Sequence, residues 1–185
     1  KLDQTTRFTL PARKLLDICR SLPEDSELEF DIKDEKAHIK SGKSRFTLAT
    51  LPAQEYPVID ITEETIDFNL SHENLMRLLT NTQFAMAQQD VRYYLNGLML
   101  EVSSNSIKAV ATDGHRLAFD ETDAEISANE SKQIIVPRKG VTELVRLLQT
   151  SKNEANIKIS KNHIQVISGN LSFTSKLIDG KFPDY

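Results

Sequence analysis

The chain has 185 residues, of which 39% are hydrophobic and 27% charged. This composition is typical of a folded chain with a sizeable core, and no apolar run approaches the roughly 18 residues that span a membrane. Because no signal-peptide pattern opens the sequence, the chain is expected to be cytoplasmic. A net charge of −4 excludes nucleic-acid binding by average charge alone, although basic side chains can still gather on one surface.

The first predicted elements are a short strand at Phe8–Leu10 and a helix over residues 11–22. The apolar spacing of this helix places the single cysteine, Cys19, on its apolar side, so Cys19 is expected to be buried and cannot form an internal disulfide. Alternating segments then predict half-buried antiparallel strands. Their core-facing residues are Leu28, Phe30, Ile32, Ile39, Phe46 and Leu48.

The same order of elements returns twice. Strands at residues 68–70 and 134–136 each precede a helix, over 71–84 and 137–150, whose apolar residues recur at helical spacing. Ser71 is expected to cap its helix, while Pro11 and Pro137 suit the first turn of theirs. Further strands are predicted around Leu98, Leu100, Val102, Ile107, Ala109, Ile157, Ile159, Ile164, Val166, Leu171 and Phe173.

These elements form three similar strand-helix-strands units. A longer similarity, between residues 41–57 and 168–183, shows that the first and third units correspond, so two units of about 60 residues should make one domain. The expected fold class is α+β, with duplicated half-units and the helices on one face of antiparallel sheets. Residues 1–60 would then lack a mate preceding Lys1. The alternative is one autonomous α+β domain with an extension.

The most chemically suggestive segment is Thr112–Leu117. One interpretation is an enzyme of the hydrolase class, in which Asp113 orients His115 as a base. However, the sequence offers no recognisable nucleophile setting, metal spacing or phosphate loop; Gly42-Lys43-Ser44 lacks the glycine required five residues earlier. The other interpretation is a docking site, in which Leu117 and Leu95 form an apolar wall and His115 and Arg116 supply donors.

A polar loop with one arginine and two tyrosines, residues 88–94, suits phosphate contact and stacking, although its tyrosines could simply cap a sheet edge. Basic residues also recur on the helices. Arg13 and Arg20 stand seven residues apart, as do Lys139 and Arg146, so each pair projects from one helix face. The helices are therefore expected to carry a basic surface, and the rest of the chain an acidic one.

Four segments closely resemble the β subunit of bacterial DNA polymerase III, the sliding clamp: residues 90–97, 111–118, 136–140 and 173–185. The resemblance implies the DNA clamp fold, in a non-catalytic, ring-shaped homodimer that encircles duplex DNA. It further implies that residues 1–60 are the second half of the first domain, 61–182 the complete middle domain, and 183–185 the start of a connector. No cofactor or metal is expected.

By the same resemblance, short peptides of polymerases, the clamp loader and repair proteins dock in a pocket. Its implied residues are Arg92, Tyr94, Leu95, Thr112, Gly114, His115, Arg116, Leu117 and Pro183. DNA of any sequence would contact the loop and the helices. The implied residues there are Arg13, Lys14, Arg77, Gln89, Arg92, Tyr93, Tyr94, Arg138, Lys139 and Arg146. No membrane partner is implied.

Overall fold

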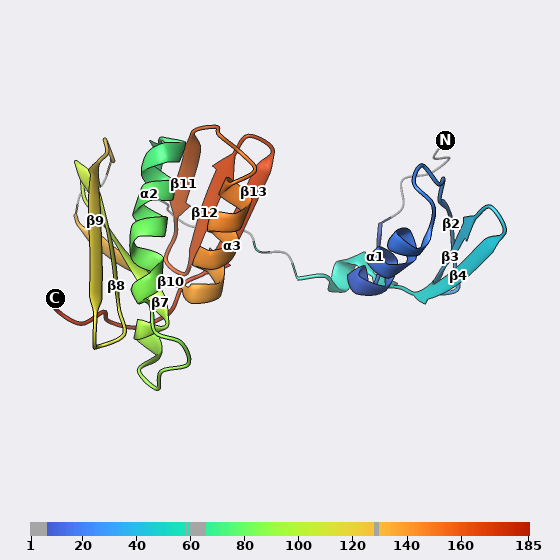
Figure 1. Ribbon diagram of the computed structural model, residues 1–185, viewed down its shortest axis with the longest axis horizontal. Helices are drawn as coiled ribbons and strands as arrows, with labels where there is room; N and C mark the ends of the chain where they lie inside the picture. The colour runs from blue at the N-terminus through green and yellow to red at the C-terminus, as the bar shows by residue number, and fades with distance from the viewer. Residues whose placement is uncertain (1–6, 58, 60–65, 128–129) are drawn as a thin grey trace. The chain divides into compact units, whose positions relative to one another are not determined.

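The computed structural model describes residues 7–57, 59, 66–127 and 130–185. The chain divides into two compact units, Lys1–Ile59 and Asp60–Tyr185 (Figure 1). The predicted boundary between residues 60 and 61 lies outside the described part of the chain.

Three helices form where the apolar spacing predicted them: α1 (Ala12–Ser21), α2 (His72–Thr82) and α3 (Arg138–Leu148). Ser71 caps α2 as expected, because its Oγ accepts a hydrogen bond from Asn74 N at 3.2 Å. Pro11 and Pro137 lie one residue earlier than predicted, as extended N-cap residues. The fixed φ of proline suits either position, so the sequence alone could not separate them.

The larger unit contains two antiparallel four-stranded sheets (Figure 1). One has the order β10-β7-β8-β9, with bounds Lys132–Pro137, Gly97–Val102, Ser106–Thr112 and Leu117–Asp123. The other has the order β13-β12-β11-β6, with bounds Leu171–Lys176, His163–Ser168, Ala155–Ile159 and Ile66–Leu70. Buried side chains from both sheets and from α2 and α3 form one core. This arrangement confirms the α+β fold class with helices packed on one face of each sheet.

The opening strands of the two half-units are exchanged. β6 precedes α2 but pairs with β11, so that Phe68 lies opposite Ile157. β10 precedes α3 but pairs with β7, so that Val136 lies opposite Leu98. Each half therefore completes the sheet of the other, and the predicted sharing of one core between two half-units is confirmed.

A second, smaller apolar cluster lies on the other face of the β10-β7-β8-β9 sheet, because strand side chains alternate between faces. Ile134 points into the main core, whereas Ile135 joins the smaller cluster. The segment that follows β13 crosses here: Ile178 N donates to Ile135 O at 2.9 Å, and Phe182 is only 3% exposed. The remaining members of this cluster are Ala87, Leu95, Met99 and Val110.

In the smaller unit, α1 packs on a three-stranded antiparallel sheet of β2 (Glu29–Lys33), β3 (Lys36–Ser41) and β4 (Ser44–Ala49). A two-stranded sheet of β1 (Phe8–Thr9) and β5 (Leu51–Pro52) precedes the 3-10 turn η1 (Ala53–Glu55). The prediction that Cys19 is buried was wrong, because Cys19 is exposed. The small core covers only a narrow strip of α1, on which Ile18 is the buried residue.

Strand β9 was not predicted. Of its residues only Ala118 is buried, while Leu117 and Phe119 are about half exposed, so the strand shows no apolar alternation.

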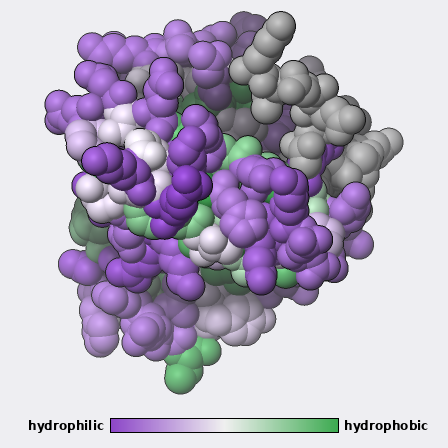
Figure 2. All heavy atoms as spheres, turned by 90° about the vertical axis from the view of Figure 1, so that its right-hand side faces the viewer, coloured by the Kyte–Doolittle hydropathy of each residue, from purple (hydrophilic) through white to green (hydrophobic). Residues whose placement is uncertain are grey.

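In the space-filling view, hydrophilic side chains cover most of the visible face and leave only small apolar areas (Figure 2). No helix in the described part of the chain is long and apolar enough to cross a membrane.

Candidate functional site

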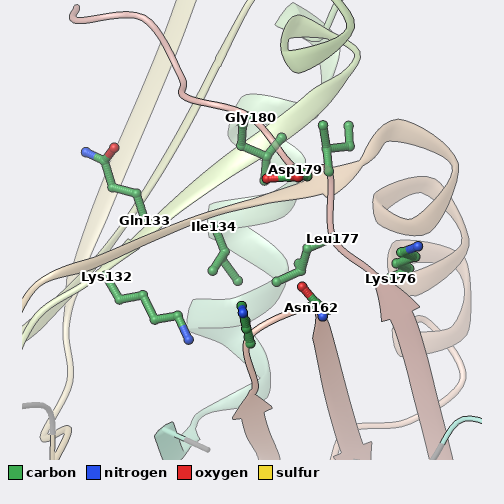
Figure 3. Close-up of a pocket in the computed structure, with 11 residues that line it drawn as sticks. Lys132, Gln133, Ile134, Asn162, Lys176, Leu177, Asp179 and Gly180 are labelled. Atoms are coloured by element: carbon green, nitrogen blue, oxygen red, sulfur yellow. The ribbon is translucent and has the colours of Figure 1, made fainter.

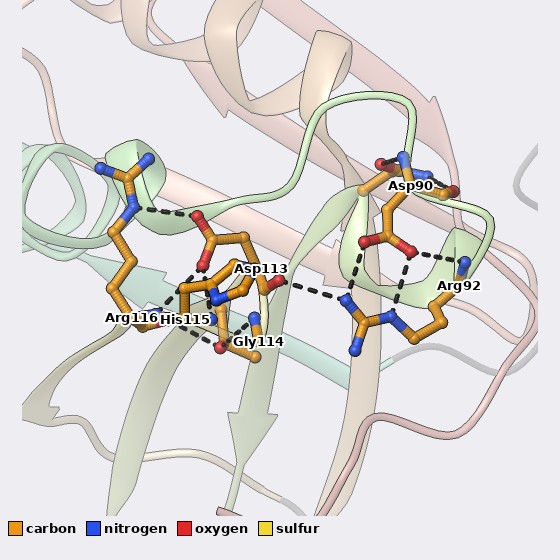
Figure 4. A network of polar contacts seen from close by, with 8 residues as sticks. Asp90, Arg92, Asp113, Gly114, His115 and Arg116 are labelled. Carbon is orange, nitrogen blue, oxygen red and sulfur yellow. Dashed lines mark hydrogen bonds and ion pairs between the residues drawn. The ribbon is translucent and has the colours of Figure 1, made fainter.

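The turn between β8 and β9 is held by its own side chains (Figure 4). The Asp113 carboxylate accepts hydrogen bonds from His115 N at 2.9 Å and from Arg116 N at 3.0 Å. It also accepts one from Arg116 Nε at 3.0 Å. These bonds, led by that from the His115 backbone, lower the pKa of Asp113 below its ordinary value. The carboxylate therefore fixes the turn instead of orienting the His115 imidazole, which removes the geometric basis of the acid–base interpretation.

Thr112 and Gly114 complete this turn. Thr112 Oγ1 donates to Arg116 O at 2.7 Å and accepts from Gly114 N at 3.0 Å. Gly114 has a φ of +88°, a left-handed conformation that glycine adopts without the steric cost of a side chain.

Arg92 connects this turn to the neighbouring loop, residues 88–96 (Figure 4). The Asp90 carboxylate accepts from Arg92 N at 2.8 Å, from Nε at 3.0 Å and from Nη2 at 2.8 Å. Arg92 Nη2 also donates to Asp113 O at 3.2 Å. The loop and the turn thus meet through one guanidinium, and the two predicted sites share a boundary.

The side-chain hydrogen bond from Arg92 is the main reason why the pKa of Asp90 is lowered from 3.8 to about 2. A carboxyl whose pKa is depressed by folding stabilises the folded state above its unfolded pKa. Its contribution is therefore present above about pH 4 and is lost as the pH falls toward 2.

Apolar surface flanks the turn on the β9 side. Leu117 is 49% exposed, and the Arg116 guanidinium lies 5.8 Å from the centroid of the Phe84 ring, in a cation–π arrangement. Phe84 belongs to the 3-10 turn η2 (Gln83–Ala85) and was not predicted as a site residue. Leu95 is 2% exposed and belongs to the smaller apolar cluster, so it does not form a wall of this surface.

The two predicted tyrosines lie in the 3-10 turn η3 (Tyr93–Leu95), with their rings edge to face and their centroids 5.8 Å apart. Tyr93 is exposed, whereas Tyr94 packs against the smaller apolar cluster. Gly180, in the segment after β13, lies close to both, since a Cβ atom added there would lie 3.2 Å from the Tyr93 ring and 3.4 Å from Tyr94 Cβ. Pro183 is exposed and follows the buried Phe182.

The predicted loop tip is exposed. Gln89 has a φ of +59°, and Val91, on the other side of Asp90, is 95% exposed. Both precede Arg92 in the same exposed loop, which thus offers a ligand an amide, an apolar side chain and a guanidinium.

The predicted basic residues on the helices differ in how they are engaged. Arg77 pairs with Asp120 and donates to Glu121 O at 3.0 Å, so it is tied to β9. Arg146 pairs with Glu143 at 2.7 Å and remains exposed. Arg138 is partly buried and donates to Met86 O at 2.8 Å. Lys139, and on α1 Arg13 and Lys14, are exposed.

Asn96 is a residue that the sequence interpretation missed. Its side-chain oxygen accepts from Asp90 N at 2.9 Å, and its Nδ2 donates to Asp90 O at 2.8 Å. The Asn-Gly dipeptide at residues 96 and 97 signals a change of direction, but which backbone groups an asparagine side chain binds is not readable from the dipeptide.

A separate cavity of about 300 Å³ lies between β10, the turn at residues 160–162 and the segment after β13 (Figure 3). It is lined by Lys132, Lys161 and Lys176 around Ile134 and Leu177. Lys132 Nζ donates to Ser160 O at 3.0 Å. None of the predicted site residues lines this cavity. In the described part of the chain, no group of three or more His, Cys, Asp or Glu residues could hold a metal ion.

Comparison with known proteins matches two family models. The description "DNA polymerase III beta subunit, central domain" matches residues 69–184, and "DNA polymerase III beta subunit, N-terminal domain" matches residues 1–60. A beta sliding clamp of Pseudomonas aeruginosa is 50% identical over 178 residues, which cover 96% of this chain and 48% of that relative. The chain spans about half the length of the relatives it matches.

Solved structures agree with these matches. The crystal structure of the DNA polymerase III subunit beta from Pseudomonas aeruginosa aligns with a TM-score of 0.89 and 48% identity, covering 100% of this chain and 52% of that one. A sliding clamp from the same organism bound to griselimycin aligns with a TM-score of 0.86 and 48% identity, covering 100% and 51%. This chain therefore belongs to the DNA polymerase III beta subunit family.

Proposed function

We propose that the chain is part of a sliding clamp, the processivity factor of a bacterial replicative DNA polymerase. The whole protein would be a cytoplasmic, non-catalytic homodimeric ring that encircles duplex DNA and docks short peptides of polymerases, the clamp loader and repair proteins. The observation that carries this proposal is that both units match the beta subunit, in the same order and with close to half of the residues identical.

The proposed domain organisation follows the duplicated half-units. Residues 1–60 would form the second half of a first domain, 61–182 the complete middle domain, and 183–185 the start of a connector to a third. The exchange of opening strands between the half-units of the larger unit supports this division. The smaller unit has one helix and one three-stranded sheet, which correspond to one such half.

The protein would hold DNA without recognising its base sequence. Basic side chains on α3 and on the loop at residues 88–96 would contact phosphates, and such contacts carry no sequence information. Because counterions replace lysine and arginine at each phosphate easily, a few exposed contacts permit sliding, while the ring prevents escape. Lys139 and Arg146 suit this role best, since both are exposed on α3.

Replacing Lys139 and Arg146 together with alanine should weaken the salt dependence of DNA binding. Each lost phosphate contact reduces the slope of log K against log salt by about 0.9 for duplex DNA, so the pair should reduce it by roughly two. Fluorescence anisotropy of a labelled duplex across a salt series measures this slope. The control removes Lys152 and Lys161, which are equally exposed and outside the proposed surface. Equal slopes in the two double variants would contradict the assignment.

Peptides would dock against the turn at residues 112–117. Half-exposed Leu117 offers an apolar anchor, and the Arg92 and Arg116 guanidinium groups, both hydrogen-bonded to Asp113 of this turn, offer donors. Because a related clamp is described as bound to griselimycin, we propose that this compound binds the same surface here. It provides a defined probe for the docking site.

Leu117→Asp should lower the affinity for griselimycin at least tenfold, since it removes apolar contact and places a carboxylate in the docking surface. Isothermal titration calorimetry with the chain of 185 residues measures the affinity. Leu51→Asp, at an exposed leucine of the smaller unit, controls for the added charge and should bind as the unchanged chain does. Intact binding by the Leu117 variant would rule out this docking surface.

A further inference from the structure

Asn96 closes the loop that carries Arg92. Its side-chain amide makes two hydrogen bonds with the backbone of Asp90, one accepted at 2.9 Å and one donated at 2.8 Å. The amide thus imitates a paired backbone and holds residues 90 and 96 together, as a short sheet ladder would. Both backbone groups of Asp90 depend on this single side chain.

The backbone of Asn96 is itself fixed. Asn96 O accepts from Arg138 N at 2.9 Å, at the first residue of α3, and Asn96 N donates to Tyr93 O at 3.1 Å. Next to it, Ala87 N donates to Leu95 O at 3.0 Å, which closes the base of the loop. Asn96 therefore links the exposed tip of the loop, through hydrogen bonds, to the start of α3 and to the base of the loop.

Asp90 in turn fixes the position of Arg92 by hydrogen bonds. Its carboxylate binds the Arg92 backbone N–H and two guanidinium nitrogens, so the orientation of Asp90 decides where the guanidinium lies. Arg92 then reaches Asp113 O at 3.2 Å. An arginine without such a clamp samples many rotamers, and binding a ligand would have to restrict them.

We propose that Asn96 is a positioning residue that holds Arg92, through Asp90, at the junction of the DNA-facing loop and the peptide-docking turn. This proposal rests on the proposed function, because it takes DNA as the ligand of the loop that carries Arg92 and a peptide as the ligand of the turn that Arg92 contacts. Asn96 is partly buried and its amide is engaged with Asp90, so it acts on ligands through Arg92 and not by touching them.

The variant Asn96→Asp tests this role with almost no change of shape. It keeps the acceptor for Asp90 N but places an oxygen opposite Asp90 O, where the amide donates now. A net hydrogen bond is worth about a fivefold change in an equilibrium constant, so griselimycin should bind about five- to tenfold more weakly. Asn170→Ala, at an exposed asparagine whose side chain makes no hydrogen bond to the described residues, should change the affinity less than twofold. Asn96→Ala, which adds no charge, should act in the same direction.

A double-mutant cycle distinguishes positioning from general loosening of the loop. If Asn96 acts through Arg92, then Asn96→Asp should change griselimycin affinity less than twofold in a chain that already carries Arg92→Ala. The same loss of affinity in both backgrounds would overturn the proposal.

A nuclear magnetic resonance readout needs no ligand. The Arg92 Nε–H signal should shift or broaden in Asn96→Asp and stay unchanged in Asn170→Ala, because only the first frees the guanidinium. An unchanged signal in both variants would overturn the proposal. Failure of the unmodified chain to bind griselimycin would instead count against the proposed docking function, and the nuclear magnetic resonance result would still decide the role of Asn96.

Discussion

Replacing Gly114 with alanine is expected to weaken griselimycin binding at least tenfold. Two effects combine at this position. The φ of +88° is left-handed, where a side chain costs about 1–2 kcal/mol. In addition, a Cβ atom would lie 3.0 Å from both terminal guanidinium nitrogens of Arg92, a tight contact that requires the guanidinium to shift from its place on the turn by a few tenths of an ångström. Calorimetric titration of the variant, together with its thermal unfolding, measures both effects.

Gly42→Ala provides a matched control for this variant. Gly42 also has a left-handed φ, +54°, but no atom lies within 4 Å of the Cβ that alanine would add. It should therefore show the backbone cost alone and leave griselimycin binding unchanged. If Gly114→Ala bound griselimycin as well as Gly42→Ala does, Arg92 would not be held at the docking surface in the way described.

Replacing Phe182 with alanine should destabilise the larger unit by about 3–5 kcal/mol, the usual cost of truncating a buried phenylalanine. Phe182 is 3% exposed and anchors the segment after β13 on the smaller apolar cluster. Leu95 belongs to that cluster, so the loss also undermines the loop at residues 88–96. Urea unfolding, followed through an amide signal of β8, reports this unit separately from the smaller one.

Phe119→Ala is the appropriate comparison, since Phe119 lies 48% exposed on β9. Its truncation removes the same atoms with a smaller loss of buried surface and should cost clearly less than that of Phe182. Equal costs for the two phenylalanines would mean that the segment after β13 contributes little to the stability of the sheet.

Much of the fold was predictable from the sequence, because helix and strand periodicity are local properties. The apolar spacing located α1, α2 and α3, and the repeated order of elements indicated half-units that share a core. The pairing of β6 with β11 and of β10 with β7 was not predictable in this way, since strand partners distant in sequence leave no local pattern. Strand β9 was missed because it buries only Ala118.

The candidate site was predictable in its residue types but not in its contacts. The Asp113–His115 pair suggested acid–base chemistry until the turn showed the carboxylate bound to backbone N–H groups. Similarly, the charge of Arg77 was visible in the sequence, but its ion pair with Asp120, 43 residues later, was not. Long-range partners decide whether a charged side chain is available to a ligand, and a single sequence does not contain them.

The exchanged opening strands have a mechanical consequence. Separating the two halves of the larger unit would require two rows of backbone hydrogen bonds, β6 with β11 and β10 with β7, to rupture together. A force applied to one half is therefore also transferred to the other half through these paired strands. The interlocked halves should therefore yield to force only as one block.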